Sequence, residues 1–171
     1  MDQHIQIEQL FLKLYDEYAG PIFRHCYFRV SSRELAEDLT QESFMRTWNY
    51  LAEKNRIDNP KAFLYRVAEN LVVDYYRKKK ELSLDVLAES GFDPTGDDAE
   101  SIVDYAAARH VREVMERLEP AHQEILVMRY IDDLSIRDIA EIVDESDNVV
   151  SVRIHRALGR LKKLLTHGKT T

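Results

Sequence analysis

The chain has 171 residues, of which 44% are apolar and 32% charged, and its formal net charge is −7. These totals suit one globular domain or two small ones, and five Gly with four Pro leave little room for a turn-rich β architecture. No apolar run approaches the roughly 18 residues that span a bilayer, and the N-terminus lacks a signal-peptide pattern. We therefore expect no membrane insertion, and the single Cys26 suits a cytoplasmic location.

The first block of the chain is expected to be helical throughout. Apolar residues recur at helical spacing over residues 5–18. Gly20 and Pro21 then predict a break, followed by a second segment that ends near Val30.

Two further helix starts follow in this block. Ser31, with Glu34 three residues later, predicts a long helix that reaches about Glu53. Asn59 and Pro60 supply an N-cap with proline at the first helical position, and this helix is expected to end near residue 80. The apolar residues expected on its buried side are Phe63, Leu64, Val67, Leu71 and Tyr75.

The negative charge is concentrated in one segment. Residues 1–80 carry 13 Lys and Arg against 12 Asp and Glu, a net +1, and residues 105–171 carry 11 of each. Residues 81–104 carry eight carboxylates and no Lys or Arg, so their −8 accounts for the overall −7. Because Gly and Pro also interrupt this segment, we expect a flexible acidic linker between two blocks.

The second block contains a helix-turn-helix pattern. Glu119 and Pro120 open one helix, and Ser135 with Asp138 has the capping-box spacing of another. The expected buried side of that helix is formed by Ile139, Ala140 and Val143. The last helix follows a polar turn, and its apolar stripe consists of Val150, Ile154, Ala157, Leu161 and Leu164.

The opposite stripe of the last helix suits a polyanion. It carries Val149, Val152, Arg153, Arg156, Arg160 and Lys163. For this segment alone, a solvated helical hairpin within a bundle is the alternative. The fold class predicted for the whole chain is all-α, with two small helical domains at residues 1–80 and 105–171 joined by the flexible acidic linker.

Two motif sets resemble bacterial sigma factors. Three segments resemble region 4: LEPAHQEILVMRY at residues 118–130, LSIRDIAEI at 134–142 and RIHRA at 153–157. Two segments resemble region 2: EDLTQESF at residues 37–44, followed by Trp48, and NPKAFLYRVAEN at 59–70, followed by DYYR at 74–77. Regions 2 and 4 joined by a short linker are the layout of the extracytoplasmic-function group.

The resemblance implies a polymerase-binding helix in the first block. Its residues are Asp38, Gln41, Glu42, Phe44 and Trp48. Three of them, at i, i+3 and i+4, share one helix face, and an acidic and amide-bearing face suits a basic helical partner. The alternative is a solvated acidic face beside buried aromatic residues. The implied partner sites are the clamp helices of the largest polymerase subunit and, for region 4, the flap of the second subunit.

The resemblance also implies capture of the unpaired −10 strand. The candidate residues are Arg56, Asp58, Asn59, Lys61, Phe63, Arg66, Asn70, Tyr76 and Arg77. Cations suit the phosphates of a single strand, and aromatic or amide groups suit its splayed bases. Adjacent helix residues point about 100° apart, so one of Tyr75 and Tyr76 is expected in the core.

The −35 reading helix departs from the family pattern. Asp144 stands where the turn usually carries Gly. We therefore expect either that Asp144 or its neighbour adopts an unusual backbone conformation, or that the turn itself differs. Val149 and Val152 replace polar residues and can contact thymine methyl groups. Phosphate contacts are expected from Arg153, Arg156, Arg160 and Lys163.

The predicted function is that of a sigma factor that binds core RNA polymerase and promoter DNA, without catalytic activity, metal or cofactor. The resemblance also allows an anti-sigma partner, and it implies that the acidic linker mimics RNA inside polymerase; an inert spacer is the alternative. One rival function is a stand-alone regulator that binds duplex DNA and uses residues 1–80 to dimerise or to sense a ligand. The other, a helical metal-dependent hydrolase, lacks HExxH, CxxC or paired carboxylate-histidine spacing.

Overall fold

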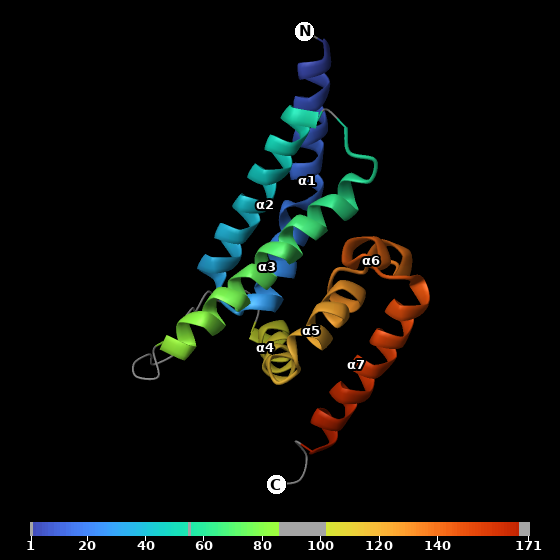
Figure 1. Cartoon of the computed structure of the whole chain (residues 1–171). Coiled ribbons are helices and arrows are strands. Elements are labelled where there is room, and N and C mark those ends of the chain that lie inside the picture. Colours follow the sequence, from blue (N-terminus) through green and yellow to red (C-terminus); the bar gives the residue numbers. More distant parts are fainter. Residues whose placement is uncertain (1, 55, 86–101, 168–171) are drawn as a thin grey trace. The chain divides into compact units, whose positions relative to one another are not determined.

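The computed structural model describes residues 2–54, 56–85 and 102–167, and the predicted all-α class is confirmed (Figure 1). The described residues form seven α helices and one short π helix, with no strand among them. Within these ranges, no helix combines the length and apolarity needed to cross a membrane. The chain divides into two compact units, Met1–Asp97 and Asp98–Thr171, which are described separately below.

Three long helices form the first unit: α1 (Asp2–Val30), α2 (Arg33–Lys54) and α3 (Pro60–Asp85). Each of them packs against the other two, so a single core lies between them (Figure 1). Its fully buried apolar side chains are Ile22, Cys26, Ala36, Leu51, Leu64, Ala68 and Val72.

The break predicted at Gly20 and Pro21 is wrong, because α1 continues through Pro21 without interruption. A proline inside a helix removes one backbone hydrogen bond and usually bends or ends the helix. Here the inward side of α1 is buried both before and after the proline, at Leu14, Ile22 and Cys26. Packing on α2 and α3 therefore maintains the helix where the local sequence alone favours its end.

The predicted start of α2 is displaced by one residue. Ser31 has a φ of 55°, in the left-handed region, and its N–H donates to the Tyr27 carbonyl at 2.9 Å, which closes the end of α1. Ser32 is the N-cap instead, since its Oγ accepts a hydrogen bond from the Leu35 N–H at 3.3 Å. Two adjacent serines thus divide the tasks of ending one helix and starting the next.

The start of α3 is confirmed and its predicted end is wrong. Asn59 Oδ1 accepts a hydrogen bond from the Ala62 N–H at 3.2 Å, as an N-cap does. The helix reaches Asp85, five residues past the predicted end, because residues 81–85 contain no helix-breaking Gly or Pro. The predicted linker therefore begins with helix, and residues 86–101 lie outside the described residues.

The buried side of α3 matches the prediction only in part. Leu64 and Leu71 are buried as expected, whereas Phe63 and Val67 are half-buried. Tyr65 and Ala68 are buried as well, which turns the inner face slightly from the predicted one.

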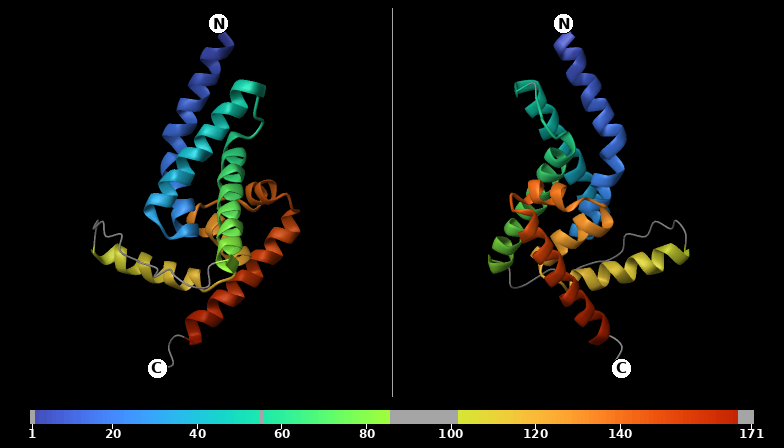
Figure 2. Two further views of the ribbon diagram at one scale, coloured as in Figure 1. Left: turned by 60° about the vertical axis from the view of Figure 1, so that its left-hand side comes forward. Right: turned by 90° about the vertical axis from the view of Figure 1, so that its right-hand side faces the viewer.

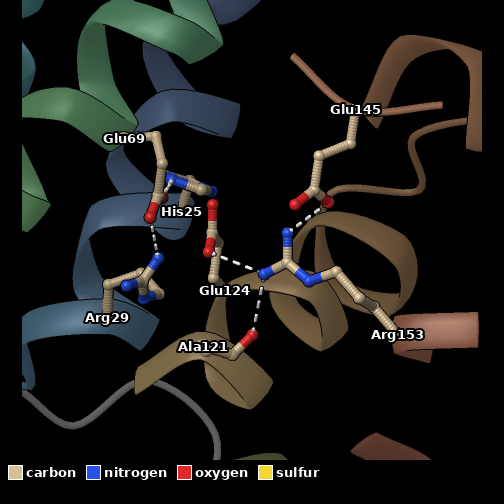
Figure 3. A network of polar contacts seen from close by, with 7 residues as sticks. All are labelled: His25, Arg29, Glu69, Ala121, Glu124, Glu145 and Arg153. Carbon is tan, nitrogen blue, oxygen red and sulfur yellow. Dashed lines mark hydrogen bonds and ion pairs between the residues drawn. The ribbon is translucent and has the colours of Figure 1, made fainter. Parts of the chain in front are cut away.

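A buried charge cluster joins α3 to α1. The Glu69 carboxylate lies 2.9 Å from His25 Nε2 and also accepts a hydrogen bond from the Arg29 guanidinium (Figure 3). All three side chains are buried, and the Tyr76 hydroxyl adds a bond by donating to the Arg29 carbonyl. Burial raises the pKa of Glu69, but the Arg29 charge and the His25 contacts outweigh burial and lower it from 4.5 to about 2.

This cluster predicts a pH-dependent contribution to stability. Because the Glu69 pKa is lower in the folded than in the unfolded chain, its stabilisation is present above about pH 4.5 and lost as the pH falls toward 2. Glu69→Gln leaves Arg29 buried without its carboxylate. We therefore expect the free energy of unfolding, measured in urea at pH 7, to fall by roughly 3–5 kcal/mol. The difference in this free energy between variant and wild type should narrow as the pH falls from 4.5 to 2.

The matched control is Glu37→Gln, whose carboxylate pairs with Arg33 at 3.1 Å on the surface. An exposed pair of this kind contributes about 0–1 kcal/mol, so this variant should stay close to wild type at every pH. If the unfolding free energies of Glu69→Gln and wild type differ by the same amount down to pH 2, the Glu69 carboxylate does not stabilise the fold through its charge.

The second unit contains α4 (Ile102–Glu116), α5 (Pro120–Leu126), the π helix η1 (Val127–Ile131), α6 (Ile136–Val143) and α7 (Asp147–His167). Short connections join successive elements from α5 onward, and α6 and α7 meet at a steep angle (Figure 2). The fully buried apolar side chains of this unit are Ile125, Val127, Met128, Leu134, Ile139, Val150 and Ala157.

The buried amide of Gln123 ties the end of α4 to α5. Its Nε2 donates to the carbonyls of Met115 at 2.7 Å and Leu118 at 3.2 Å. The predicted start of α5 is confirmed, with Glu119 as the N-cap residue and Pro120 as the first helical residue.

The start of α6 is also confirmed, since Ser135 Oγ accepts a hydrogen bond from the Asp138 N–H at 3.0 Å. On the inner side of α6, Ile139 and Ala140 are buried as predicted. Ile142 is buried in place of Val143, which is half-buried.

Candidate nucleic-acid interface

In the turn before α7, Asp144 itself takes the unusual backbone conformation, which is one of the alternatives left open by the sequence. Asp144 adopts φ 56° and ψ 47°, the left-handed conformation that Asp tolerates better than most residues, and its N–H donates to the Ala140 carbonyl. Ser146 then begins α7, because its Oγ accepts a hydrogen bond from the Val149 N–H at 3.3 Å. A polar turn without Gly can therefore set the direction of α7.

Burial defines which side of α7 faces outward. Val150, Ile154 and Ala157 are buried as predicted, and Leu161 and Leu164 are half-buried toward the C-terminal end. At 100° per residue, Val152 points within about 20° of the direction opposite the buried stripe. The outward face therefore has Val152 near its middle, with Arg156 and Lys163 beside it.

Arg153 lies to one side of this outward face, and its phosphate contact stays a prediction. It is half-buried, and Nη1 lies 2.8 Å from Glu145 while Nη2 lies 3.0 Å from Glu124 and 3.3 Å from the Ala121 carbonyl (Figure 3). Burial lowers the Arg153 pKa, but these two carboxylates outweigh burial and raise it. Its guanidinium thus joins α7 to α5 and to the turn.

The other candidates on α7 are exposed. They are Val149, Val152, Arg156, Arg160 and Lys163. Three exposed carboxylates occupy the entrance to the helix, at Asp144, Glu145 and Asp147, so positive charge increases toward the C-terminal end of α7.

The proposed polymerase-binding residues on α2 separate into two groups. Asp38 and Gln41 are exposed, and Glu42 is half-buried with its carboxylate 2.7 Å from Arg46 Nε. Phe44 is only 3% exposed, so its prediction as a surface contact is corrected. It packs edge to face against Phe11 and Tyr15 of α1.

Sequence reasoning missed Met45, which is 56% exposed on the same side of α2. It follows Gln41 by four residues and Asp38 by seven, a spacing that places the three on one helix face. Trp48 is half-buried and lines a shallow groove with Glu8 and with apolar residues of α1, Phe11 and Leu12. Extending the i, i+4, i+7 series from Asp38 would have found Met45.

On α3, the structure brings several −10 candidates onto one exposed side. Arg66, Asn70 and Arg77 are exposed and follow at i, i+4 and i+11. Lys61 is half-buried near the start of the helix. The exposed Val73, which sequence reasoning missed, lies on the same side.

Other −10 candidates have internal contacts. Arg56 Nε and Asp58 form an exposed ion pair at 3.0 Å, and Asn59 caps α3. Phe63 is half-buried against the Tyr50 ring, with centroids 4.6 Å apart.

The two adjacent tyrosines of α3 are both half-buried, but they have different contacts. The Tyr76 hydroxyl donates a hydrogen bond to the Arg29 carbonyl of α1, and its contact with DNA stays a prediction. The Tyr75 ring lies beside Tyr76 and 6.0 Å from the Lys79 ammonium group.

Comparisons with known proteins match both units. The family model of Sigma-70 region 2 matches residues 14–81, and that of Sigma-70, region 4, matches residues 109–161. The chain is 27% identical to the ECF RNA polymerase sigma factor SigW of Bacillus subtilis over 168 residues, covering 92% of this chain and 90% of SigW. The chain belongs to the extracytoplasmic-function (ECF) sigma factors.

Other relatives support this family. ECF RNA polymerase sigma factor BldN of Streptomyces coelicolor is 27% identical over 91% of this chain, which spans 60% of the length of BldN. RNA polymerase sigma factor YlaC of Bacillus subtilis is 28% identical over 99% of this chain and 97% of YlaC. The predicted boundaries at residues 80 and 104 stay a prediction.

Two solved structures share the fold of this sigma factor. The sigma factor RpoE, in complex with the anti-sigma factor NepR from Bartonella quintana, has a TM-score of 0.69 and 22% identity, covering 91% of this chain and 96% of RpoE. CnrH, in complex with the cytosolic domain of CnrY, has a TM-score of 0.70 and 19% identity, covering 94% of this chain and 90% of CnrH.

The Arg153 contacts predict a measurable coupling within region 4. In a double-mutant cycle of Arg153→Ala and Glu124→Gln, we expect a coupling energy of about 1 kcal/mol, since the pair is partly shielded from solvent. Arg153→Ala should therefore lower the melting temperature by several degrees, measured by circular dichroism.

Arg156→Ala is the matched control because Arg156 is exposed on the same helix, and its effect on stability should stay within about 0.5 kcal/mol. Equal melting temperatures for the Arg153 and Arg156 variants would contradict a positioning role for Arg153.

Proposed function

We propose that this ECF sigma factor recruits core RNA polymerase to a restricted set of promoters, with region 2 opening and holding the −10 strand and region 4 reading the −35 duplex. The observation that carries the proposal is the order of two sigma regions in one chain, each with an exposed face of matching chemistry. The same chain directs initiation without catalysing a reaction, and polymerase makes the RNA.

The polymerase contact is proposed on α2. Asp38 and Gln41 supply acidic and amide groups, Met45 supplies an exposed apolar side chain, and Glu42 and Trp48 flank them. This mixture suits a basic amphipathic helical surface, and the family resemblance identifies it as the clamp helices of the largest subunit. Phe44 supports the face from inside, because it holds α2 against α1.

The −10 strand is proposed to cross the exposed side of α3. Arg66 and Arg77 would bind phosphates, and Asn70, between them on the same side, would bond to a base edge. Arg56, Asp58 and Lys61 lie at or near the loop before α3, where polar groups can hold an extruded base.

The −35 duplex is proposed to bind α7. Arg156, Arg160 and Lys163 would anchor phosphates along the cationic part of the helix, with Val149 and Val152 nearer the base edges. Arg153 would act as a positioning residue that holds α7 in place for these contacts.

Three further aspects of the proposal rest on the family. Region 4 would also contact the flap of the second polymerase subunit, and the protein would act in the cytoplasm. RpoE and CnrH were each solved with a bound partner, and we propose an anti-sigma partner for this chain as well. The acidic linker would occupy the RNA path in polymerase until the transcript displaces it.

Co-purification with core polymerase from the source bacterium, followed by run-off transcription of genomic fragments, tests the proposal. We expect a stable complex and a small set of new transcripts that core polymerase alone does not make. The variant Asp38→Arg/Met45→Asp should lose core binding because it reverses the charge and removes the apolar contact. A stand-alone regulator would instead bind duplex DNA tightly without polymerase, and this result would refute the proposal.

The salt dependence of promoter binding tests the phosphate contacts. With the holoenzyme, Arg156→Ala should weaken binding and reduce the slope of log K against log salt by about 1, since one phosphate contact is lost. Arg117→Ala, which removes an exposed cation near the end of α4, is the control and should leave the slope unchanged. An unchanged slope for Arg156→Ala would show that this residue does not contact a phosphate.

A further inference from the structure

We infer that Val152 is a specificity-determining residue of α7 that packs against the 5-methyl group of a thymine in the −35 element. This inference rests on the proposed function, because it takes α7 as the helix that enters the major groove. Beyond that function, it identifies the thymine methyl group as the feature that is recognised and Val152 as the side chain that contacts it.

The position of Val152 on the helix is the first argument. It is 47% exposed and points away from the buried side chains Val150, Ile154 and Ala157. In a helix-turn-helix, the N-terminal part of the second helix contacts base edges, and Val152 lies in its second turn. Gly159, two turns later on the same side, has no side chain, and no other group fills the space beside it.

The contacts of its neighbours are the second argument. The Ser151 hydroxyl donates to the Asp147 carbonyl at 2.9 Å, and the Arg153 guanidinium bonds to Glu124 and Glu145. The two residues that flank Val152 in sequence therefore already use their polar groups within region 4. Asn148 and His155, one turn to either side of Val152, are exposed and place polar groups beside it.

The distribution of charge along α7 is the third argument. Carboxylates at Asp144, Glu145 and Asp147 surround the start of the helix, whereas the exposed cations Arg156 and Lys163 follow Val152. Phosphates are repelled from the first turn and attracted to later ones, so the backbone contacts belong to the C-terminal part. The start of α7 is then free to lie directly above the base edges in the major groove.

The chemistry of the groove identifies the group that Val152 reads. Thymine presents an apolar methyl group in the major groove, and the other three bases present only polar groups or hydrogen there. A valine offers two methyl groups and no donor or acceptor, so it favours thymine and leaves the polar edges of other bases without a partner.

Deoxyuridine differs from thymidine only by the missing methyl group and therefore tests the contact directly. Each thymine of the −35 element in a promoter found by run-off transcription is replaced singly by deoxyuridine, and holoenzyme binding is measured. We expect one position at which wild type loses about fourfold in affinity, the factor that corresponds to burial of one methyl group. The Val152→Ala holoenzyme should bind thymine and deoxyuridine equally at that position.

Val149→Ala is the matched control, since Val149 is also an exposed valine of α7 but points about 70° from the outward direction. It should keep the preference for thymine at the position that Val152→Ala loses. Val152 is exposed, so its variant should fold like wild type, which circular dichroism verifies.

Two results would overturn the inference while the proposed function stands. One is a transcribing holoenzyme whose −35 binding is insensitive to deoxyuridine at every thymine, or whose element has no thymine. The other is a deoxyuridine effect that persists at full size in Val152→Ala, because the methyl group then has another partner. A chain that neither binds core polymerase nor supports transcripts would overturn the proposed function and this inference together.

Discussion

One guanidinium, held between two carboxylates, fastens α7 in the direction that the turn before it sets. Arg153 lies on α7, Glu124 on α5 and Glu145 in the turn, so their contacts connect the three parts of the helix-turn-helix. The apolar stripe of α7 fixes which side is inward, and this ion pair limits how the helix can roll or slide over α5. Base recognition needs side chains placed to within a fraction of an ångström, and a polar clamp beside the apolar stripe supports such placement.

Region 2 uses a buried carboxylate in a related way. Glu69 faces inward against His25 and Arg29, and the next residue, Asn70, is exposed on the side proposed for the −10 strand. Because adjacent helix residues point about 100° apart, the inward bond of Glu69 also sets the direction of Asn70. In both regions, an ion pair holds a helix whose exposed side is proposed to face DNA.

The sequence predicted those features that depend on local chemistry. The caps at Asn59 and Ser135 follow from a few neighbouring residues, and the structure confirms them. At the turn before α7, the sequence left alternatives open, and the structure has Asp144 in the left-handed conformation. Features that depend on distant partners were missed. Periodicity puts Arg153 on a cationic stripe, but only the fold brings Glu124, 29 residues away, to its guanidinium. Likewise, the buried position of Phe44 depends on rings from α1.

On the proposed function, this chain enables core polymerase to open promoter DNA. Permanganate oxidises unpaired thymines, so its reactivity at the −10 element of a linear promoter measures opening directly. The account predicts reactive thymines only when chain and core polymerase are both present. It also predicts weaker reactivity for Asn70→Ala at equal core binding, because this variant keeps the α2 face. Binding of the holoenzyme without any permanganate-reactive thymine would contradict the account.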